Sequence, residues 1–202
     1  MRQLKDICEG VFDVDDNIEN MGETLKKDIA DFIENTYANT VSKVKYDISK
    51  EANKDGKFEV ELWGDVYVKN GSIEHLTNGR FIFTTCYGNF DCSDCDIVSL
   101  EGCPAWVKNF LCSGCNFLKN LKGSPDTVRG SFSCDSCNSL KNLDGCPKEV
   151  TDFNCADCSI LTSLKGAPKV VKGNFRADSC GGKFIANDIT SVSKVHGNII
   201  VK

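Results

Sequence analysis

The chain repeats one sequence pattern four times, in copies that begin at Phe90, Phe110, Phe132 and Phe153. The shared pattern is F-x-C-x-x-C-x-x-L-x-x-L-x-G-x-P-x-x-V, and successive copies start 20 to 22 residues apart. A period of this length, with one short apolar strand in each copy, indicates a solenoid in which each copy packs on its neighbours. The repeat therefore constrains the fold more strongly than any other feature of the 202 residues.

Each copy has an inner and an outer face. Because alternate residues of a strand face the same side, Phe132 and Cys134 are predicted to point inward while Ser133 points outward. Parallel strands lie about 4.8 Å apart, so equivalent phenylalanines and cysteines should form continuous inner columns. Gly145 and Pro147 are expected to turn the chain back, since glycine adopts positive φ and proline fixes φ. The other inner positions of this copy are Leu140, Leu143 and Val150.

The chain before the repeats has a different pattern. We expect an N-terminal segment of residues 1–57 and a solenoid of residues 58–202, with atypical end copies that meet water or a partner. The fold class is accordingly α+β. The N-terminal patterns predict a helix over residues 2–12, a loop over 13–20, an amphipathic helix over 22–37 and a hairpin over 40–68 that turns at residues 53–56. Atypical solenoid strands are predicted at 66–68, 81–83, at Phe175 and at 195–201.

The repeat resembles the leucine-rich repeat family, whose pattern is L-x-x-L-x-L-x-x-N/C-x-L. In one copy Val128, Phe132 and Cys134 occupy leucine-like positions, and Cys137 occupies the Asn/Cys position. The departures are extra residues after some valines, C-x-x-L in place of C-x-L, and the recurrent G-x-P. The resemblance covers residues 60–202 and implies a short leucine-rich-repeat-like parallel β-solenoid. The repeat is also similar to uncharacterised repeat proteins of tailed bacteriophages, which implies an accessory or virion-associated protein and supplies no activity.

Four C-x-x-C pairs are the motif that most suggests a ligand. They are Cys92/Cys95, Cys112/Cys115, Cys134/Cys137 and Cys155/Cys158, with 16 to 18 residues between pairs. Pairs about 15–20 residues apart are typical of zinc sites. Each pair nevertheless accompanies the same Phe, Leu, Gly and Pro, which zinc does not require, and free cysteine is a small apolar residue. We expect reduced, buried, metal-free thiols, the second cysteine bonding backbone groups at the bend. The alternative is a zinc-binding regulatory module.

Composition limits the location and the partners. The net charge is -5, so general attraction to nucleic acid or to acidic membranes is not expected. No apolar window of about 18 residues is present, so no membrane span is predicted. The start of the chain lacks the apolar run of a signal peptide, and 13 cysteines without such a signal suggest thiols in a reducing compartment. We expect a cytoplasmic protein, in the bacterial host cytosol or the virion if a phage encodes it.

Catalytic motifs are missing from the sequence. It contains no GxSxG, P-loop or HExxH pattern, and its two histidines, His75 and His196, lie beside no cysteine or serine nucleophile pattern. The acidic residues 13–17 lack the sixth-position glycine and the twelfth-position glutamate of a calcium-binding loop, so a solvated loop is the better interpretation. We expect neither an enzyme nor a cofactor.

The outward strand positions are the candidate binding surface, because a solenoid presents its sheet as one extended face. These positions are polar and mildly acidic, and they lack the aromatic and basic residues that single-stranded nucleic acid requires. We expect a non-enzymatic scaffold that binds a protein partner rather than nucleic acid. The alternative is a sheet that is polar only for solubility. The candidate residues are Asp91, Leu111, Ser133, Asp135, Asp152, Asn154 and Arg176.

Overall fold

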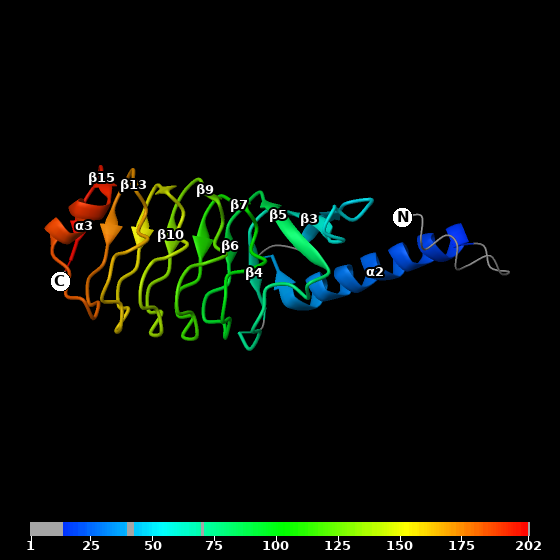
Figure 1. Cartoon of the computed structure of the whole chain (residues 1–202), viewed down its shortest axis with the longest axis horizontal. Coiled ribbons are helices and arrows are strands. Elements are labelled where there is room, and N and C mark those ends of the chain that lie inside the picture. The colour runs from blue at the N-terminus through cyan, green and yellow to red at the C-terminus, as the bar shows by residue number, and fades with distance from the viewer. Residues whose placement is uncertain (1–13, 40–42, 70, 202) are drawn as a thin grey trace.

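The chain folds into a parallel β-solenoid of about six turns, with a helix that projects from one end (Figure 1). This computed structural model describes residues 14–39, 43–69 and 71–201, with side chains from residue 21 onward. Successive turns are spaced by about 22 residues, as the repeat predicts. The expected α+β class, with a parallel solenoid after a helical segment and a hairpin, is therefore confirmed.

The first sheet runs the length of the solenoid. It has eight strands in the order β1-β4-β6-β8-β10-β12-β14-β16. Neighbouring strands in this sheet are parallel except for β1, which pairs antiparallel with β4 and ends the sheet on the N-terminal side. The strands are β1 (Tyr37–Ala38), β4 (Val66–Val68), β6 (Phe90–Asp91), β8 (Phe110–Leu111), β10 (Phe132–Ser133), β12 (Phe153–Asn154), β14 (Phe175–Arg176) and β16 (Ile199–Ile200).

The second sheet is divided into two parts. Strands pair in the orders β2-β3-β5-β7-β9 and β11-β13-β15, so the ladder stops between β9 and β11. The antiparallel pair β2–β3 is the expected hairpin, but its second strand ends at Trp63, and residues 66–68 belong to the first sheet. Its turn is closed by the Gly56 N–H, which donates to the Asn53 carbonyl at 2.9 Å. The strands are β2 (Lys45–Ile48), β3 (Phe58–Trp63), β5 (Phe81–Cys86), β7 (Trp106–Val107), β9 (Thr127–Val128), β11 (Glu149–Val150), β13 (Val170–Val171) and β15 (Lys194–Val195).

Equivalent phenylalanines from five turns stack into one inner column, as predicted. Phe132 lies between Phe110 and Phe153 in the strand register. All five rings are at most 1 % exposed, and neighbouring centroids lie 5.0–6.0 Å apart. Burial of these apolar columns is the main force that holds the turns together. The inner positions Cys134, Leu140, Leu143 and Val150 are also buried.

Two sharp bends recur in each turn. The residue before the second cysteine of each pair has positive φ: 55° at Asp94, 71° at Gly114, 58° at Ser136 and 55° at Asp157. At the G-x-P bend, Gly145 has φ of 100°, and a Cβ placed there would lie 2.4 Å from the backbone of Leu121 in the preceding turn. Glycine is therefore required at this bend both by the backbone angle and by the close approach of the neighbouring turn.

The N-terminal helix α2 (Val14–Thr36) is longer than predicted. The predicted loop over residues 13–20 is wrong, because the helix already begins at Val14. The C-terminal half of the helix buries Ile29 and Ile33 against the first turns of the solenoid. The predicted helix over residues 2–12 lies outside the described residues.

A second helix, α3 (Ala186–Val192), closes the last turn and was not predicted. Its start is fixed by the Asp188 carboxylate, which accepts the Ile185 N–H at 2.8 Å, and its Ile189 is buried. Neither described helix has the length and apolar character needed to cross a membrane.

Candidate functional site

The outer face of the first sheet presents one side chain from each of its seven parallel strands, β4 to β16, in direct register. The outward column runs Tyr67, Asp91, Leu111, Ser133, Asn154, Arg176 and Ile200. The inner column beside it runs Val66, Phe90, Phe110, Phe132, Phe153, Phe175 and Ile199. The outward residue differs in every turn, whereas five successive inner residues are phenylalanine. The structure thus brings together five of the seven candidate residues in one row.

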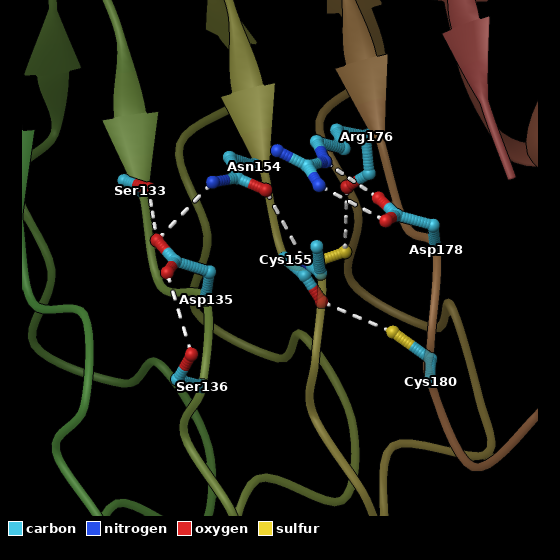
Figure 2. A network of polar contacts seen from close by, with 9 residues as sticks. Ser133, Asp135, Ser136, Asn154, Cys155, Arg176, Asp178 and Cys180 are labelled. Carbon is cyan, nitrogen blue, oxygen red and sulfur yellow. Dashed lines mark hydrogen bonds and ion pairs between the residues drawn. The ribbon is translucent and has the colours of Figure 1, made fainter. Parts of the chain in front are cut away.

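Asp135 is the centre of a polar network on this face (Figure 2). Its Oδ1 accepts hydrogen bonds from Ser113 Oγ at 2.5 Å, Ser133 Oγ at 2.6 Å and Asn154 Nδ2 at 3.1 Å. The network therefore links three successive turns through one carboxylate. Burial acts to raise the pKa of Asp135, but the serine hydroxyls outweigh it and hold the pKa below its ordinary value. The carboxylate is charged at neutral pH.

An ion pair continues the face toward the C-terminus. Arg176 binds Asp178 through two nitrogens, Nε at 2.6 Å and Nη2 at 3.0 Å (Figure 2). The Arg176 hydrogen bonds lower the pKa of Asp178. The Arg176 side chain is 48 % exposed and that of Asp178 15 %, so the cation is the more accessible member. This pair fixes the position of the positive group on an otherwise acidic face.

Asp152 belongs to a different structural feature, at the bend that precedes the first-sheet strand. Its Oδ1 accepts the backbone N–H of Asn174 in the next turn at 2.7 Å. Asn174 in turn accepts the Asn198 N–H at 2.9 Å, and Asp65 accepts the Asn89 N–H at 2.8 Å. Side-chain oxygens at this bend thus bind successive turns to each other. The contacts of Asp152 are those of a structural residue rather than of an open surface.

The second cysteine of the second, third and fourth pairs bonds backward to the preceding turn, as does Cys180 of the last copy, whereas Cys95 bonds to the Ser93 carbonyl of its own turn at 3.4 Å. The Sγ–carbonyl distances are 3.1 Å for Cys115 to Cys92, 3.1 Å for Cys137 to Cys112, 3.3 Å for Cys158 to Cys134 and 3.1 Å for Cys180 to Cys155, the last shown in Figure 2. The first cysteines of the pairs are 0 % exposed. The expectation that the second cysteine bonds backbone groups at the bend, while the first fills the core, is confirmed.

The thiols differ in acidity according to their surroundings. Burial raises the pKa of Cys95 and of Cys158 to about 12. Hydrogen bonding to the Cys92 thiol lowers the pKa of Cys115, and hydrogen bonding to Cys155 lowers that of Cys180. Within the described ranges, no three side chains of His, Cys, Asp or Glu are arranged to hold a metal ion. His75 and His196 are both exposed.

A second group of surface residues was missed by the sequence patterns. Trp63, Tyr87, Trp106 and Arg129 lie next to one another on the outer face of the second sheet. The signal that could have revealed them is that both tryptophans of the chain fall on strands of this sheet. The repeat pattern does not place these four residues together, because Trp63 and Tyr87 precede the regular copies.

Comparison with family models, with curated proteins and with solved structures finds no match to this chain.

Proposed function

We propose that this chain is a non-enzymatic scaffold that binds a protein partner on the outer face of the first sheet. The supporting observation is the contrast between two adjacent columns. From Tyr67 to Ile200 the outward side chain changes at every turn, while the inner side chain beside it stays apolar and bulky. Such a face can present a different chemical group to each segment of a bound chain.

The polar groups on this face are held in position before a partner arrives. Asp135 is bonded by Ser113, Ser133 and Asn154, and the Arg176 fork is fixed by Asp178. Binding to ordered side chains avoids part of the entropy cost of an interface. Seven strands about 4.8 Å apart span roughly 30 Å, which matches an extended segment of about nine residues.

Two features of the thiols support a binding role over a catalytic one. A catalytic cysteine must be accessible and ionised. Burial raises the pKa of Cys95 and Cys158 to about 12, which keeps these thiols neutral at physiological pH. Cys115, whose pKa is lowered, is 0 % exposed and donates to a backbone carbonyl inside the column.

The narrower proposal is an accessory or virion-associated protein of a phage. Its support is the similarity of the repeat to phage repeat proteins. Mass spectrometry of purified phage particles from the source of this sequence should find the chain if it is part of the virion.

A pair of double variants tests the binding face. Tyr67→Arg with Leu111→Arg changes the outward column at two half-exposed positions that carry no charge. Val98→Arg with Phe117→Arg adds the same charges at exposed apolar positions of the segment after the second cysteine. With affinity capture from the native host, the first pair should lower recovery of a specific partner by about tenfold or more, and the second by less than about twofold. Equal loss in both, or loss only in the second pair, would contradict the proposed face.

A further inference from the structure

The outer face of the second sheet carries a row of contacting aromatic side chains. The rings of Trp63 and Tyr87 stack with centroids 4.2 Å apart and an interplanar angle of 19°. The ring centroids of Tyr87 and Trp106 lie 6.2 Å apart, and the Arg129 guanidinium lies 5.6 Å from the Trp106 ring centroid. Trp63 and Tyr87 are each 46 % exposed. Trp, Tyr and Arg are the residues that dominate binding energy at protein interfaces.

On this face the basic residues outnumber the acidic ones, unlike in the chain as a whole. The whole chain carries -5, yet the side chains that follow the aromatic row on this sheet and its bends are mainly basic. The acidic residues of this surface are Glu61, which accepts a hydrogen bond from the Tyr87 hydroxyl at 3.5 Å, Asp126, and Glu149, which is paired with Lys172 at 2.5 Å. The exposed basic residues are Lys108, Arg129, Lys148, Lys172 and Lys194.

A groove opens where the second sheet is interrupted. Strands β9 and β11 do not pair, and the Thr151 N–H instead donates to the Gly130 carbonyl at 2.8 Å. The space beside them has a volume of about 630 Å³. Its lining includes Asp126, Thr127, Arg129, Lys148, Glu149 and Lys172. Arg129 therefore belongs both to the aromatic row and to the wall of the groove.

We propose that this surface, from Trp63 to the groove between β9 and β11, binds an acidic polypeptide segment. Exposed guanidinium and ammonium groups bind carboxylates, and Arg does so with a planar fork of donors. The groove beside Arg129 has room for a side chain of the bound segment. The surface is separate from the first-sheet face, so the scaffold would hold two partners of different chemistry.

The aromatic geometry favours a polypeptide over single-stranded nucleic acid. Nucleic-acid platforms leave ring faces open, so that bases can stack on them. Here one face of Trp63 is covered by Tyr87, and the Arg129 guanidinium lies over one face of Trp106. Tryptophan also carries an indole N–H, which suits polar contacts with a polypeptide chain.

Titration with poly-L-glutamate tests the assignment. Both tryptophans of the chain, Trp63 and Trp106, lie on this surface, so their fluorescence reports directly on it. The triple variant Lys108→Ala, Arg129→Ala, Lys172→Ala removes three positive charges here. The matched control Lys119→Ala, Lys122→Ala, Lys141→Ala removes three exposed positive charges elsewhere. Thermal melting checks that both variants are folded.

We expect poly-L-glutamate to change the tryptophan fluorescence, and the first triple variant to weaken binding by about tenfold or more. The control triple variant, and the Tyr67→Arg, Leu111→Arg pair, should leave the affinity within about twofold. Failure of poly-L-glutamate to bind, or equal weakening by both triple variants, would overturn the assignment. Tighter binding of an oligothymidylate of about 20 nucleotides, lost in the first triple variant, would assign the surface to nucleic acid instead.

Discussion

The thiol of Cys137 donates a hydrogen bond to the carbonyl oxygen of Cys112, 3.1 Å away in the preceding turn. The same relationship joins Cys115 to Cys92 and Cys158 to Cys134. In each C-x-x-C pair the first cysteine therefore fills the core and accepts a bond at its carbonyl, and in the last three pairs the second cysteine reaches back to the neighbouring copy. The spacing that resembles a zinc motif is explained by the way in which one turn holds the next.

Replacement of Cys137 should separate hydrogen bonding from packing. Cys137→Ala removes the donor and leaves a small void, and should lower the free energy of unfolding by about 2 kcal/mol. Cys137→Ser keeps a donor near the Cys112 carbonyl and should cost less. Urea melts of the two variants measure the difference. A serine variant less stable than the alanine variant would show that the hydrogen bond to Cys112 does not stabilise the fold.

Alkaline pH should destabilise the protein through its buried thiols. Burial raises the pKa of Cys86 from 9.0 to about 11 and that of Cys95 to about 12. The unfolded chain therefore loses these protons first, so their stabilising effect is complete below pH 9 and is lost as pH rises toward 11 and 12. Melting temperatures measured across this range should fall. In the Cys86→Ala variant the melting temperature should fall less steeply between pH 9 and 11 than in the unchanged protein. An equally steep fall would show that the raised pKa of Cys86 does not contribute to the loss of stability.

Truncation of Phe132 should be far more costly than truncation of an outward residue on the same sheet. Phe132 is 0 % exposed between two other rings, so Phe132→Ala should lower the free energy of unfolding by about 3–5 kcal/mol. Leu111→Ala removes a half-buried side chain of the outward column and should cost less than about 1 kcal/mol. Denaturant melts of both variants give the comparison. Similar costs would mean that the two faces of the strands are wrongly assigned.

Two glycines with positive φ should respond differently to alanine. At Gly56, φ is 73° and an added Cβ would meet nothing within 4 Å, so Gly56→Ala should cost about 1 kcal/mol from backbone strain alone. At Gly145 the Cβ would lie 2.4 Å from the backbone of the preceding turn, so Gly145→Ala should cost more than about 3 kcal/mol. Equal destabilisation in thermal melts would show that close packing of turns is not what requires Gly145.

The regular copies could be predicted from the sequence because their inner residues repeat. The column from Phe90 to Phe175 and the burial of Leu140 and Leu143 follow from period and alternation alone. The start of α2 could not be found in this way, since the acidic residues around Asp15 show no apolar periodicity. The helix is nevertheless continuous from Val14.

The surface sites depend on contacts that no local pattern records. Strand alternation predicts which residues point outward. Only the structure shows that Asp135 accepts hydrogen bonds from Ser113, 22 residues before it, and from Asn154, 19 residues after it. The stack of Trp63 on Tyr87 joins strands whose sequences do not match the repeat. Such pairs become neighbours only through the strand register.

Site-specific photo-crosslinking tests the binding role of the first-sheet face most directly. A benzophenone amino acid would replace Leu111 in the outward column, and in a second protein Phe117, which is 53 % exposed in the segment after the second cysteine. After irradiation in extract of the native host, position 111 should yield a discrete covalent adduct with one protein partner, and position 117 should yield none. An adduct from position 117 alone, or none from either position, would contradict a partner-binding role for this face.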